Sequence, residues 1–374
     1  MRILQVSKFF PPVLGGIESA AWELTEGLNR AGHAADVLCS HHRWPGERSR
    51  AEMGYSITRA GSLGRILSTS MAPSMPLQMA RVRRRYDVVH VHLPDPLAGM
   101  SCLIGRPCGV LVLHWHSDVV RQRRAMKLYG PLQEWLLRRA DAIIATSSPY
   151  ADSSPALQSW RHKVHVIPIG IGDDTARVSR TRVAEIRRRV RGRRIVFALG
   201  RMTYYKGFDH LLTAASNLSD DTVVLIGGEG EMSNSLRARV AREGLSGKVQ
   251  FLGHVPDHEL ADHFEACDLF CMPSTVRAEA YGVAMLEAMV HAKPVVASDI
   301  AGSGVPWVNQ HGITGFNVPP GDPAALAVAI RRVLDDDSLR ASMGSAARHR
   351  YLRNFTSSAM TAATLNLYQE LTQT

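Results

Sequence analysis

Several features of secreted, membrane and redox proteins are absent from this sequence. No apolar run approaches the ~20 residues that a membrane-spanning helix needs, and the opening MRILQVSKFFPP reaches Pro11 too soon for a secretion signal. The 5 cysteines form no C-x-x-C pair, and an odd number scattered along the chain argues against a disulfide framework. We therefore expect a cytosolic chain with free, mostly buried thiols.

Acidic and aromatic residues are also scarce. There are 34 Asp and Glu against 44 Lys and Arg, which gives a net charge of +10, and aromatic residues make up 6%. Arginine carries most of the excess, in the runs 81–85, 121–124 and 187–194. Nucleic acid, anionic lipid and phosphorylated metabolites would each suit this charge, and so would a surface that is basic only for solubility. Nucleic acid is the least favoured partner, because the basic runs are not interleaved with aromatic residues and match no recognition motif.

One strand pattern occurs twice along the chain. Short apolar runs alternate with helical patterns, first at 2–6, 35–40, 88–92, 109–115, 142–147 and 163–170, then at 194–200, 222–228, 248–253, 269–274 and 294–299. Near-continuous apolar strands separated by helices indicate parallel sheets covered on both faces. Because 374 residues exceed what one core usually organises, we predict two α/β domains, each a doubly wound, Rossmann-like parallel sheet.

The same pattern predicts the domain boundaries. We expect an N-terminal, acceptor-side domain over 1–170, a linker with a basic helix over 171–193, and a C-terminal, nucleotide-sugar-binding domain over 194–350. A terminal helix over 351–374 is expected to cross back to the N-terminal domain. Doubly wound sheets bind ligands at the carboxyl ends of their strands. We therefore expect the functional residues in strand-end loops, facing one cleft.

Two glycine-rich loops follow predicted strands. Gly15 and Gly16 precede a helical pattern, where bare amides and the helix dipole favour a phosphate, although two glycines before a helix also indicate a simple turn. The segment GGEGE at 227–231 suggests a dinucleotide fingerprint. It lacks the third glycine of the G-x-G-x-x-G pattern, and the acidic ribose ligand is also missing. Neither loop identifies a ligand by itself.

The loop GRMTYYKG, residues 200–207, is more specific. Arg201 and Lys206 lie at a strand end with glycines on either side, so two cations can reach a ligand from a tightly turning loop. A diphosphate suits them, and the alternative is a pair of exposed basic residues on a turn. Further along, AEAYGVAMLEAM (278–289) places Glu279 and Glu287 on either side of a glycine. We expect Tyr281 and Gly282 to form a turn and residues 283–289 to form a helix.

Together these motifs resemble glycosyltransferase family 4, whose members have the GT-B fold, retain anomeric configuration and use nucleotide-diphosphate sugars without a metal. The resemblance also covers VVHVHLPDP (88–96), LHWHSD (113–118), ADAIIATS (140–147), VIPIGI (166–171) and TGFNVPPGD (314–322). Two stretches, HWHSDVVRQR (114–123) and GSGVPWVNQHGITG (302–315), are similar to mannosyl- and rhamnosyltransferases that build O-antigen and exopolysaccharide, many of them using GDP-mannose.

The resemblance implies a role for each charged residue. Arg201 and Lys206 would neutralise the leaving diphosphate, which is electrostatic preorganisation for a leaving group. Glu279 would bind sugar hydroxyls and face positive charge that develops at the anomeric carbon, and Glu287 would accept both ribose hydroxyls. The remaining donor-binding residues of this prediction are Gly15, Gly16, Tyr281, Gly282, Val283 and Ala284.

His116, at the end of GVLVLHW, would lie beside the donor sugar on the opposite wall. The alternative is a structural histidine, because His90, His92 and His114 lie on the same two predicted strand ends and all four cannot be catalytic. The segment VHAKPVV carries His291 and an alanine where the family often has cysteine and glycine, so this helix end is expected to be capped differently.

No cofactor or metal is expected beyond the nucleotide sugar, which would be GDP-mannose or a GDP-deoxyhexose. Residues 335–337 (DDD) contain the D-x-D of metal-using glycosyltransferases, but they lie between helical patterns and are interpreted as helix-terminal aspartates. A two-step reaction would need a carboxylate nucleophile, and Asp118 is the one spare acidic residue on the N-terminal side. The family resemblance favours same-face attack, in which the departing phosphate takes the acceptor's proton, and hence implies retention.

Three functions remain open on the sequence: a retaining hexosyltransferase, a nucleotide-sugar enzyme with other chemistry, and a nucleic-acid-binding protein. We expect the first, with a UDP-sugar as the alternative donor. A lipid-linked glycan acceptor and peripheral association with the inner face of the cytoplasmic membrane are expected from apolar and basic residues in the N-terminal half. These residues are Met71, Met75, Leu77 and Met79 before RVRRRY, and Arg121, Arg123, Arg124 and Lys127 after HWHSD.

Overall fold

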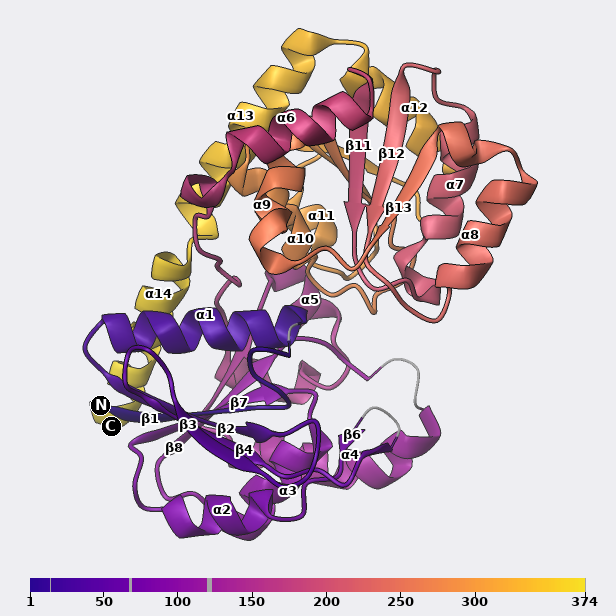
Figure 1. Cartoon of the computed structure of the whole chain (residues 1–374). Coiled ribbons are helices and arrows are strands. Elements are labelled where there is room, and N and C mark those ends of the chain that lie inside the picture. Colours follow the sequence, from indigo (N-terminus) through magenta and orange to yellow (C-terminus); the bar gives the residue numbers. More distant parts are fainter. Residues whose placement is uncertain (14, 67–68, 120–122, 374) are drawn as a thin grey trace. The chain divides into compact units, whose positions relative to one another are not determined.

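A computed structural model describes residues 1–13, 15–66, 69–119 and 123–373, with side chains for all of these except 66 and 123–128. The chain forms two compact units. The N-terminal unit comprises Met1–Gly172 and the segment from Ser357 onward, and the C-terminal unit comprises Asp173–Thr356. Each is a parallel α/β sheet flanked by helices (Figure 1). The two predicted doubly wound sheets are thereby confirmed.

The sheet of the N-terminal unit has the order β10-β9-β8-β7-β1-β2-β4-β3. Its strands are parallel except for the edge strand β3, which runs antiparallel to β4. Their bounds are β1 Arg2–Ser7, β2 Ala34–Ser40, β3 Glu47–Arg50, β4 Ser56–Ala60, β7 Val88–Leu93, β8 Val110–Trp115, β9 Ala142–Ala145 and β10 Val164–Val166, and β5 Arg65–Ile66 and β6 Thr69–Ser70 form a separate hairpin.

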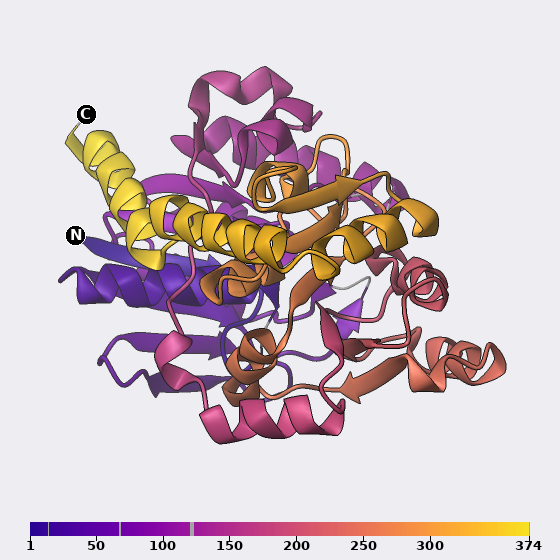
Figure 2. The ribbon, with the colours of Figure 1, turned by 90° about the horizontal axis from the view of Figure 1, so that it is seen from above.

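Helices on both faces complete this unit. They are α1 Gly16–Arg30, α2 Met75–Val82, α3 Pro96–Gly105, α4 Arg123–Arg139, α5 Ser148–Ser153 and α14 Ser357–Gln373. The last helix packs beside α1 (Figures 1 and 2). Because Gly27 on α1 has no side chain, Thr361 of α14 can approach it closely; a Cβ there would lie 2.0 Å from the Thr361 hydroxyl. Met360, Leu367 and Tyr368 of α14 join Ile3 and its neighbours in the core.

The C-terminal unit has a six-stranded sheet in the order β13-β12-β11-β14-β15-β16, and its paired strands are parallel. The strands are β11 Arg194–Leu199, β12 Thr222–Gly227, β13 Val249–Gly253, β14 Leu269–Met272, β15 Val295–Ser298 and β16 Gly315–Val318. The helices are α6 Arg180–Arg189, α7 Phe208–Ser216, α8 Ser233–Arg242, α9 Asp257–Ala266, α10 Val283–Val290, α11 Val305–Val308, α12 Pro323–Leu334 and α13 Asp337–Asn354.

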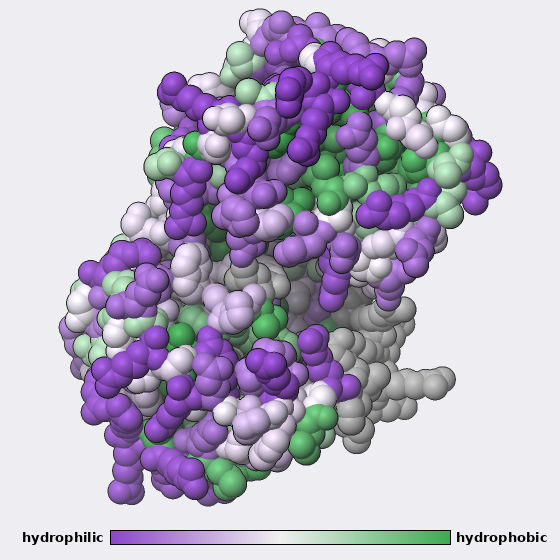
Figure 3. Space-filling view, viewed as in Figure 1, coloured by the Kyte–Doolittle hydropathy of each residue, from purple (hydrophilic) through white to green (hydrophobic). Residues whose placement is uncertain are grey.

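Side chains follow the pattern that the sequence predicts. The central strands β7, β12 and β14 are buried along their whole length, as strands covered on both faces must be. The cysteines are free thiols, of which Cys108 is exposed and the others are buried. Hydrophilic side chains cover most of the face seen in Figure 3, and apolar ones show in small groups. Among the described residues, no helix has both the length and the apolar character that crossing a membrane requires.

Candidate functional site

Two glycine-containing loops lie together at the carboxyl ends of β11 and β12. The amide of Gly200 donates to the carbonyl of Gly227 over 3.1 Å, and the amide of Met202 donates to the carbonyl of Glu229 over 2.9 Å. A side chain at Gly228 would lie 2.1 Å from the Gly200 carbonyl oxygen, so this approach requires glycine. The glycines of the second loop thus hold the first loop in place, without forming a dinucleotide fingerprint.

The first loop presents two cations in different states. Arg201 is exposed, and its guanidinium has no ion-pair partner within the described part of the chain. Lys206 is mostly buried, and its Nζ donates to Glu279 Oε2 over 2.6 Å. Burial alone would lower the pKa of Lys206, but the Glu279 carboxylate raises it above its usual value against a smaller opposing effect of Arg201. Lys206 therefore remains an ammonium ion at neutral pH.

Glu279 is held from three directions. Its Oε2 accepts from Lys206 and, over 3.0 Å, from the hydroxyl of Ser274, which follows β14. Its main-chain carbonyl accepts from the Ser303 hydroxyl over 2.5 Å. Only 11% of the Glu279 side chain is exposed. The sequence predicts separate contacts for Lys206 and Glu279 on the donor, and the structure shows that these two residues also bind each other.

The helix α10 begins where the sequence predicts, at Val283. Gly282 precedes it with φ +84°, a backbone conformation that favours glycine, and a Cβ there would also require the flexible side chains of Met272 and Met285 to shift. Without a side chain at position 282, the helix has no side-chain cap, and the amides of Val283 and Ala284 belong to the helix's electropositive end. Glu287 lies one turn further along and is partly buried.

Tyr281 does not line an open loop, because it is 3% exposed. Its ring lies 6.5 Å from Trp307 and 6.4 Å from Phe355 between ring centroids. This aromatic cluster anchors the turn before α10, so Tyr281 positions the helix start through packing. At the other end of α10, His291 caps the helix and its two ring nitrogens lie 3.1 Å from Glu265 and from Asp174.

In the N-terminal unit, His116 follows β8 as the last of a group of buried histidines. Its Nε2 lies 2.9 Å from Nδ1 of His92, and His90 Nε2 lies 3.2 Å from Nδ1 of His114. The rings of His114 and His116 stack with centroids 4.1 Å apart. Burial is the largest cause that lowers the pKa of each of the four, to about 3 for His114. All four imidazoles are therefore neutral at physiological pH.

Three of these histidines form the group best placed to hold a metal ion within the described residues. One ring nitrogen each of His90, His92 and His114 lies within 4.8 Å of the others. Both nitrogens of His90, both of His92 and Nδ1 of His114 are already in hydrogen bonds. A divalent ion would displace these bonds in a buried site, where neutral ligands leave its charge uncompensated.

Two acidic residues lie near the strand ends of the same unit. Asp118 Oδ1 accepts from the Trp115 indole over 2.9 Å and from the Ser154 hydroxyl over 2.7 Å, so this carboxylate organises the loop after β8. Asp95 was not singled out from the sequence. It caps α3 by accepting from the Leu97 amide, it is 1% exposed, and burial raises its pKa to about 6.

The predicted phosphate loop at 15–16 precedes α1. Gly15 is the N-cap residue and Gly16 begins the helix, and both are exposed. A Cβ on Gly15 would lie 2.6 Å from Oε2 of Glu18, so a carboxylate of the helix's own first turn lies beside this end. An anionic ligand at Gly15 and Gly16 would have to replace or displace that carboxylate.

The DDD segment is structural, as the sequence predicts. Asp335 caps the C-terminus of α12, and Asp336 caps the N-terminus of α13 by accepting from the Leu339 amide over 2.9 Å. Asp337 pairs with Arg340 and with Arg194. The carboxylates of Asp336 and Asp337 therefore lie at the N-terminus of α13, where the helix dipole favours negative charge, whereas Asp335 contributes its main-chain amide at the end of α12.

The apolar surface predicted before RVRRRY is wrong for two of its four residues. Met75 and Met79 are 0% exposed, because they lie one turn apart on the face of α2 that packs inward, whereas Met71 and Leu77 are 44% and 60% exposed. Of the basic residues predicted after HWHSD, Arg121 lies outside the described residues. The side chains of Arg123, Arg124 and Lys127 lie outside them as well.

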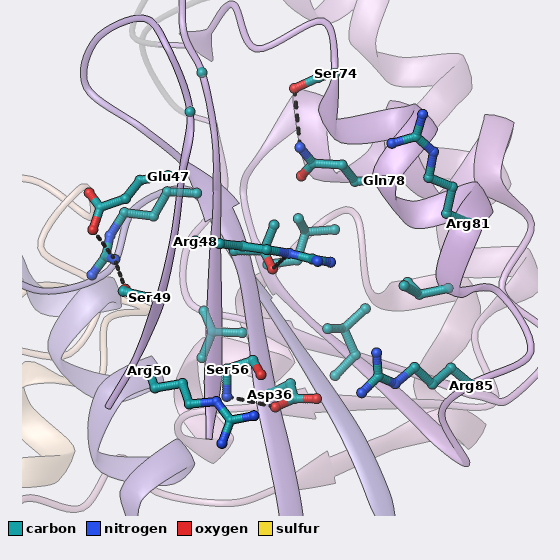
Figure 4. Close-up of a pocket in the computed structure, with 18 of the residues that line it drawn as sticks. Asp36, Glu47, Arg48, Ser49, Arg50, Ser56, Ser74, Gln78, Arg81 and Arg85 are labelled. Atoms are coloured by element: carbon teal, nitrogen blue, oxygen red, sulfur yellow. Dashed lines mark hydrogen bonds and ion pairs between the residues drawn. The ribbon is translucent and has the colours of Figure 1, made fainter. Parts of the chain in front are cut away.

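A groove of about 890 Å³ lies between α2 and the β3–β4 edge of the N-terminal sheet. Arg48 and Arg50 on β3 face Arg81 and Arg85 across it (Figure 4). None of these four has a carboxylate partner within the described residues, whereas nearby Arg59 lies 3.9 Å from Glu47. Hydroxyls and amides of Ser49, Ser56, Thr58, Ser74 and Gln78 line the remaining polar part.

The two doubly wound units, with a cation-bearing loop after β11 and a glycine-initiated helix after β14, define a GT-B glycosyltransferase. A family model described as "Glycosyl transferase 4-like domain" matches residues 15–170, and "Glycosyl transferases group 1" matches 179–350. The O-antigen chain mannosyltransferase C of Escherichia coli is 33% identical over 375 residues, which is 99% of both proteins. The chain belongs to the family 4 glycosyltransferases.

Further relatives agree with this assignment. The D-rhamnosyltransferase WbpZ of Pseudomonas aeruginosa is 33% identical over 357 residues, covering 95% of this chain and 92% of that protein. Among solved structures, a sucrose-phosphate synthase from Thermosynechococcus elongatus superposes with a TM-score of 0.82 at 20% identity, over 99% of each chain. Anabaena HepE in complex with UDP-glucose gives a TM-score of 0.78 at 20% identity, over 99% of this chain and 100% of that one. These structures support the fold.

Proposed function

We propose that this glycosyltransferase moves an α-mannosyl or rhamnosyl residue from a GDP-sugar to a lipid-linked or polysaccharide acceptor in O-antigen or exopolysaccharide synthesis, with retention of configuration. The mannosyl- and rhamnosyltransferases that share 33% identity over almost the whole chain support the sugar class. The observation that carries the chemistry is the Lys206–Glu279 ion pair near Arg201, whose guanidinium is exposed and has no ion-pair partner among the described residues.

The proposed mechanism uses these charges in sequence. Arg201, Lys206 and the amides at the start of α10 stabilise the negative charge that accumulates on the diphosphate as the glycosidic bond breaks. The Glu279 carboxylate faces the positive charge that develops on the sugar. Charge stabilisation by protein cations serves the leaving group without requiring a metal ion. Glu287 binds the nucleotide ribose.

The acceptor attacks on the same face, and the departing phosphate oxygen takes its proton. A two-step mechanism would need a carboxylate nucleophile near the anomeric carbon. Asp118, the candidate for that role in the N-terminal unit, is engaged by Trp115 and Ser154 on one oxygen. His116 accepts a hydrogen bond from a sugar hydroxyl.

A nucleotide-release assay tests the donor and the reaction class. Purified enzyme is incubated with GDP-mannose, a GDP-deoxyhexose or UDP-glucose, with and without a lipid-linked glycan acceptor. We expect acceptor-dependent release of GDP and, by NMR, an α-linked product. Preferential UDP release contradicts the donor, equal release without acceptor indicates hydrolysis, and a β-linked product contradicts retention.

The groove of the N-terminal unit supports an anionic membrane partner. Its four arginines have no carboxylate partner among the described residues, exposed Trp44 also lines the groove, and Leu77 on α2 is exposed. Basic and apolar side chains together favour an anionic lipid surface. We expect Arg81→Glu to reduce flotation with anionic vesicles at low salt. Arg188→Glu, the same charge change on α6 of the other unit, is the matched control. Equal flotation with neutral vesicles contradicts the electrostatic role.

A further inference from the structure

A chain of buried hydrogen bonds leads away from His116 into the N-terminal unit. The Nε2 atom of His116 lies 2.9 Å from Nδ1 of His92, and Nε2 of His92 lies 2.9 Å from Oε1 of Gln5 on β1. The other end of the Gln5 amide donates from Nε2 to the hydroxyl of Tyr368 over 3.4 Å. Tyr368 lies on α14, so the C-terminal helix is connected to the end of β8 through side chains.

The chain continues on the far side of Tyr368. Its hydroxyl lies 2.5 Å from Nδ1 of His90, and Nε2 of His90 lies 3.2 Å from Nδ1 of His114. Within the described residues, the chain ends at both sides on a buried ring nitrogen without a hydrogen-bond partner, namely Nδ1 of His116 and Nε2 of His114.

The chemistry of each member determines the direction of every bond. The Gln5 Oε1 atom can only accept, so His92 must carry its proton on Nε2. His92 is neutral because burial lowers its pKa, and its Nδ1 is then a bare acceptor. His116 must consequently donate from Nε2. Since His116 is also neutral through burial and through neighbouring imidazoles that lower its pKa further, its unpartnered Nδ1 carries a lone pair.

The other branch is fixed by the same rule. Tyr368 accepts from the Gln5 amide, so its single proton is available for Nδ1 of His90. His90 then donates from Nε2 to His114, whose proton lies on Nε2. A reversed Gln5 amide would invert every bond and place a proton on Nδ1 of His116. The orientation of one amide between β1 and α14 therefore sets the tautomer of a histidine at the end of β8.

We propose that Gln5 and Tyr368 are positioning residues that hold His116 in its Nε2–H tautomer and so keep a lone pair on Nδ1. Because Nδ1 is buried in this structure, it accepts a hydrogen bond from a substrate hydroxyl only once that atom is uncovered. The second half of this inference rests on the function of His116 proposed above, whereas the tautomer itself does not. In a neutral imidazole, the hydrogen bond made by one ring nitrogen determines whether the other nitrogen donates or accepts a hydrogen bond.

Two variants and a control test the chain in the full-length protein. Tyr368→Phe removes only the hydroxyl, and Gln5→Leu replaces the amide by an apolar group of similar size. Thr364→Val is the matched control, because Thr364 is equally buried on α14 and its hydroxyl has no partner within the described residues. Nitrogen-15 NMR of histidine-labelled protein, without any ligand, reports which ring nitrogen of His116 carries the proton.

We expect the wild type and Thr364→Val to show the Nε2–H tautomer of His116, and Tyr368→Phe and Gln5→Leu to show a mixture of both tautomers. An Nδ1–H tautomer in the wild type overturns the assignment. A pure Nε2–H tautomer in both variants overturns the positioning role of Gln5 and Tyr368. If Gln5→Leu does not fold, Tyr368→Phe decides the question alone.

Glycosyl-transfer kinetics of the same proteins test whether the Nδ1 lone pair of His116 contributes to turnover. We expect kcat to fall about twofold to tenfold in Tyr368→Phe and Gln5→Leu with the KM for donor unchanged, because a fraction of molecules lacks the acceptor at Nδ1. A changed tautomer with unchanged kcat shows that His116 takes no part in turnover, and this result overturns the role of the lone pair. The nucleotide-release panel, which does not depend on the tautomer, tests the proposed reaction separately.

Discussion

Replacing Glu279 by glutamine tests the ion pair at the centre of the C-terminal unit. The variant keeps an oxygen for Lys206 and for the Ser274 hydroxyl but removes the negative charge. Because both side chains of the pair are less than 15% exposed, at 14% and 11%, solvent screens this charge weakly. A hydrogen bond to a charged group contributes about 1.5–3 kcal/mol, which corresponds to about tenfold to a hundredfold in rate.

The loss should appear in turnover rather than in nucleotide binding. The Glu279 carboxylate faces charge that develops only as the glycosidic bond breaks, so its removal lowers kcat. Free nucleotide diphosphate should bind with unchanged or higher affinity, since Lys206 no longer has a competing carboxylate. Steady-state kinetics and calorimetric titration with GDP measure the two effects separately.

The pH profile of the same variant provides a second readout. In the wild type, Glu279 raises the pKa of Lys206 against burial and the nearby Arg201. Without the carboxylate, burial and Arg201 are opposed only by Tyr205, and the pKa of Lys206 falls. Turnover of Glu279→Gln should therefore decline at a lower alkaline pH than turnover of the wild type.

Ser274→Ala is the matched control, because it removes one hydrogen bond to Glu279 but leaves the ion pair. It should retain most of the activity and the wild-type alkaline profile. The assignment is refuted if Glu279→Gln turns over normally, or if it loses binding of free nucleotide diphosphate while Ser274→Ala does not.

Three further predictions concern single residues. Glu287→Gln should weaken donor and free nucleotide diphosphate alike, by about tenfold or more, with little change in kcat; titration with both ligands decides this. Asp95→Asn should raise the stability of the N-terminal unit at pH 7.5 by about 2 kcal/mol, with the gain shrinking toward pH 4 in calorimetric melts. The sign follows because the raised pKa of about 6 means that the folded carboxyl favours its proton, so stability is lost as pH rises through that value. Ala292→Gly should stabilise the C-terminal unit by about 0.5 kcal/mol in denaturant titrations, because Ala292 has φ +52°; a loss of stability would show that no strain is stored there.

Strands that are buried on both faces could be predicted, because their sequences are almost continuously apolar. The run VVHVH became β7, and LFCMPS contains β14. The edge strand Glu47–Arg50 and its neighbour Ser56–Ala60 were missed, since the first is polar and largely exposed and the second is only partly buried. The helix after Gly282 was predicted to within one residue because a glycine before a helix-forming run marks its start.

The site was predictable as a set of residues but not as a set of contacts. Arg201, Lys206 and Glu279 stand out at strand ends, yet the bond between Lys206 and Glu279 spans 73 positions in sequence and depends on how two loops meet. Met75 and Met79 illustrate the opposite error. Their spacing equally suits an inward or an outward face of a short helix, and only the packing partner decides between them.

The place of α14 has a consequence for the order in which the protein folds during synthesis. The C-terminal unit is contiguous, from Asp173 to Thr356, whereas the N-terminal unit needs the segment after Ser357. The ribosome therefore completes every residue of the C-terminal unit before it supplies Tyr368, which closes the core against Ile3 and hydrogen-bonds His90. The unit that is translated first is the last to be completed, and until then a nascent chain exposes the surface of α1 that α14 later covers.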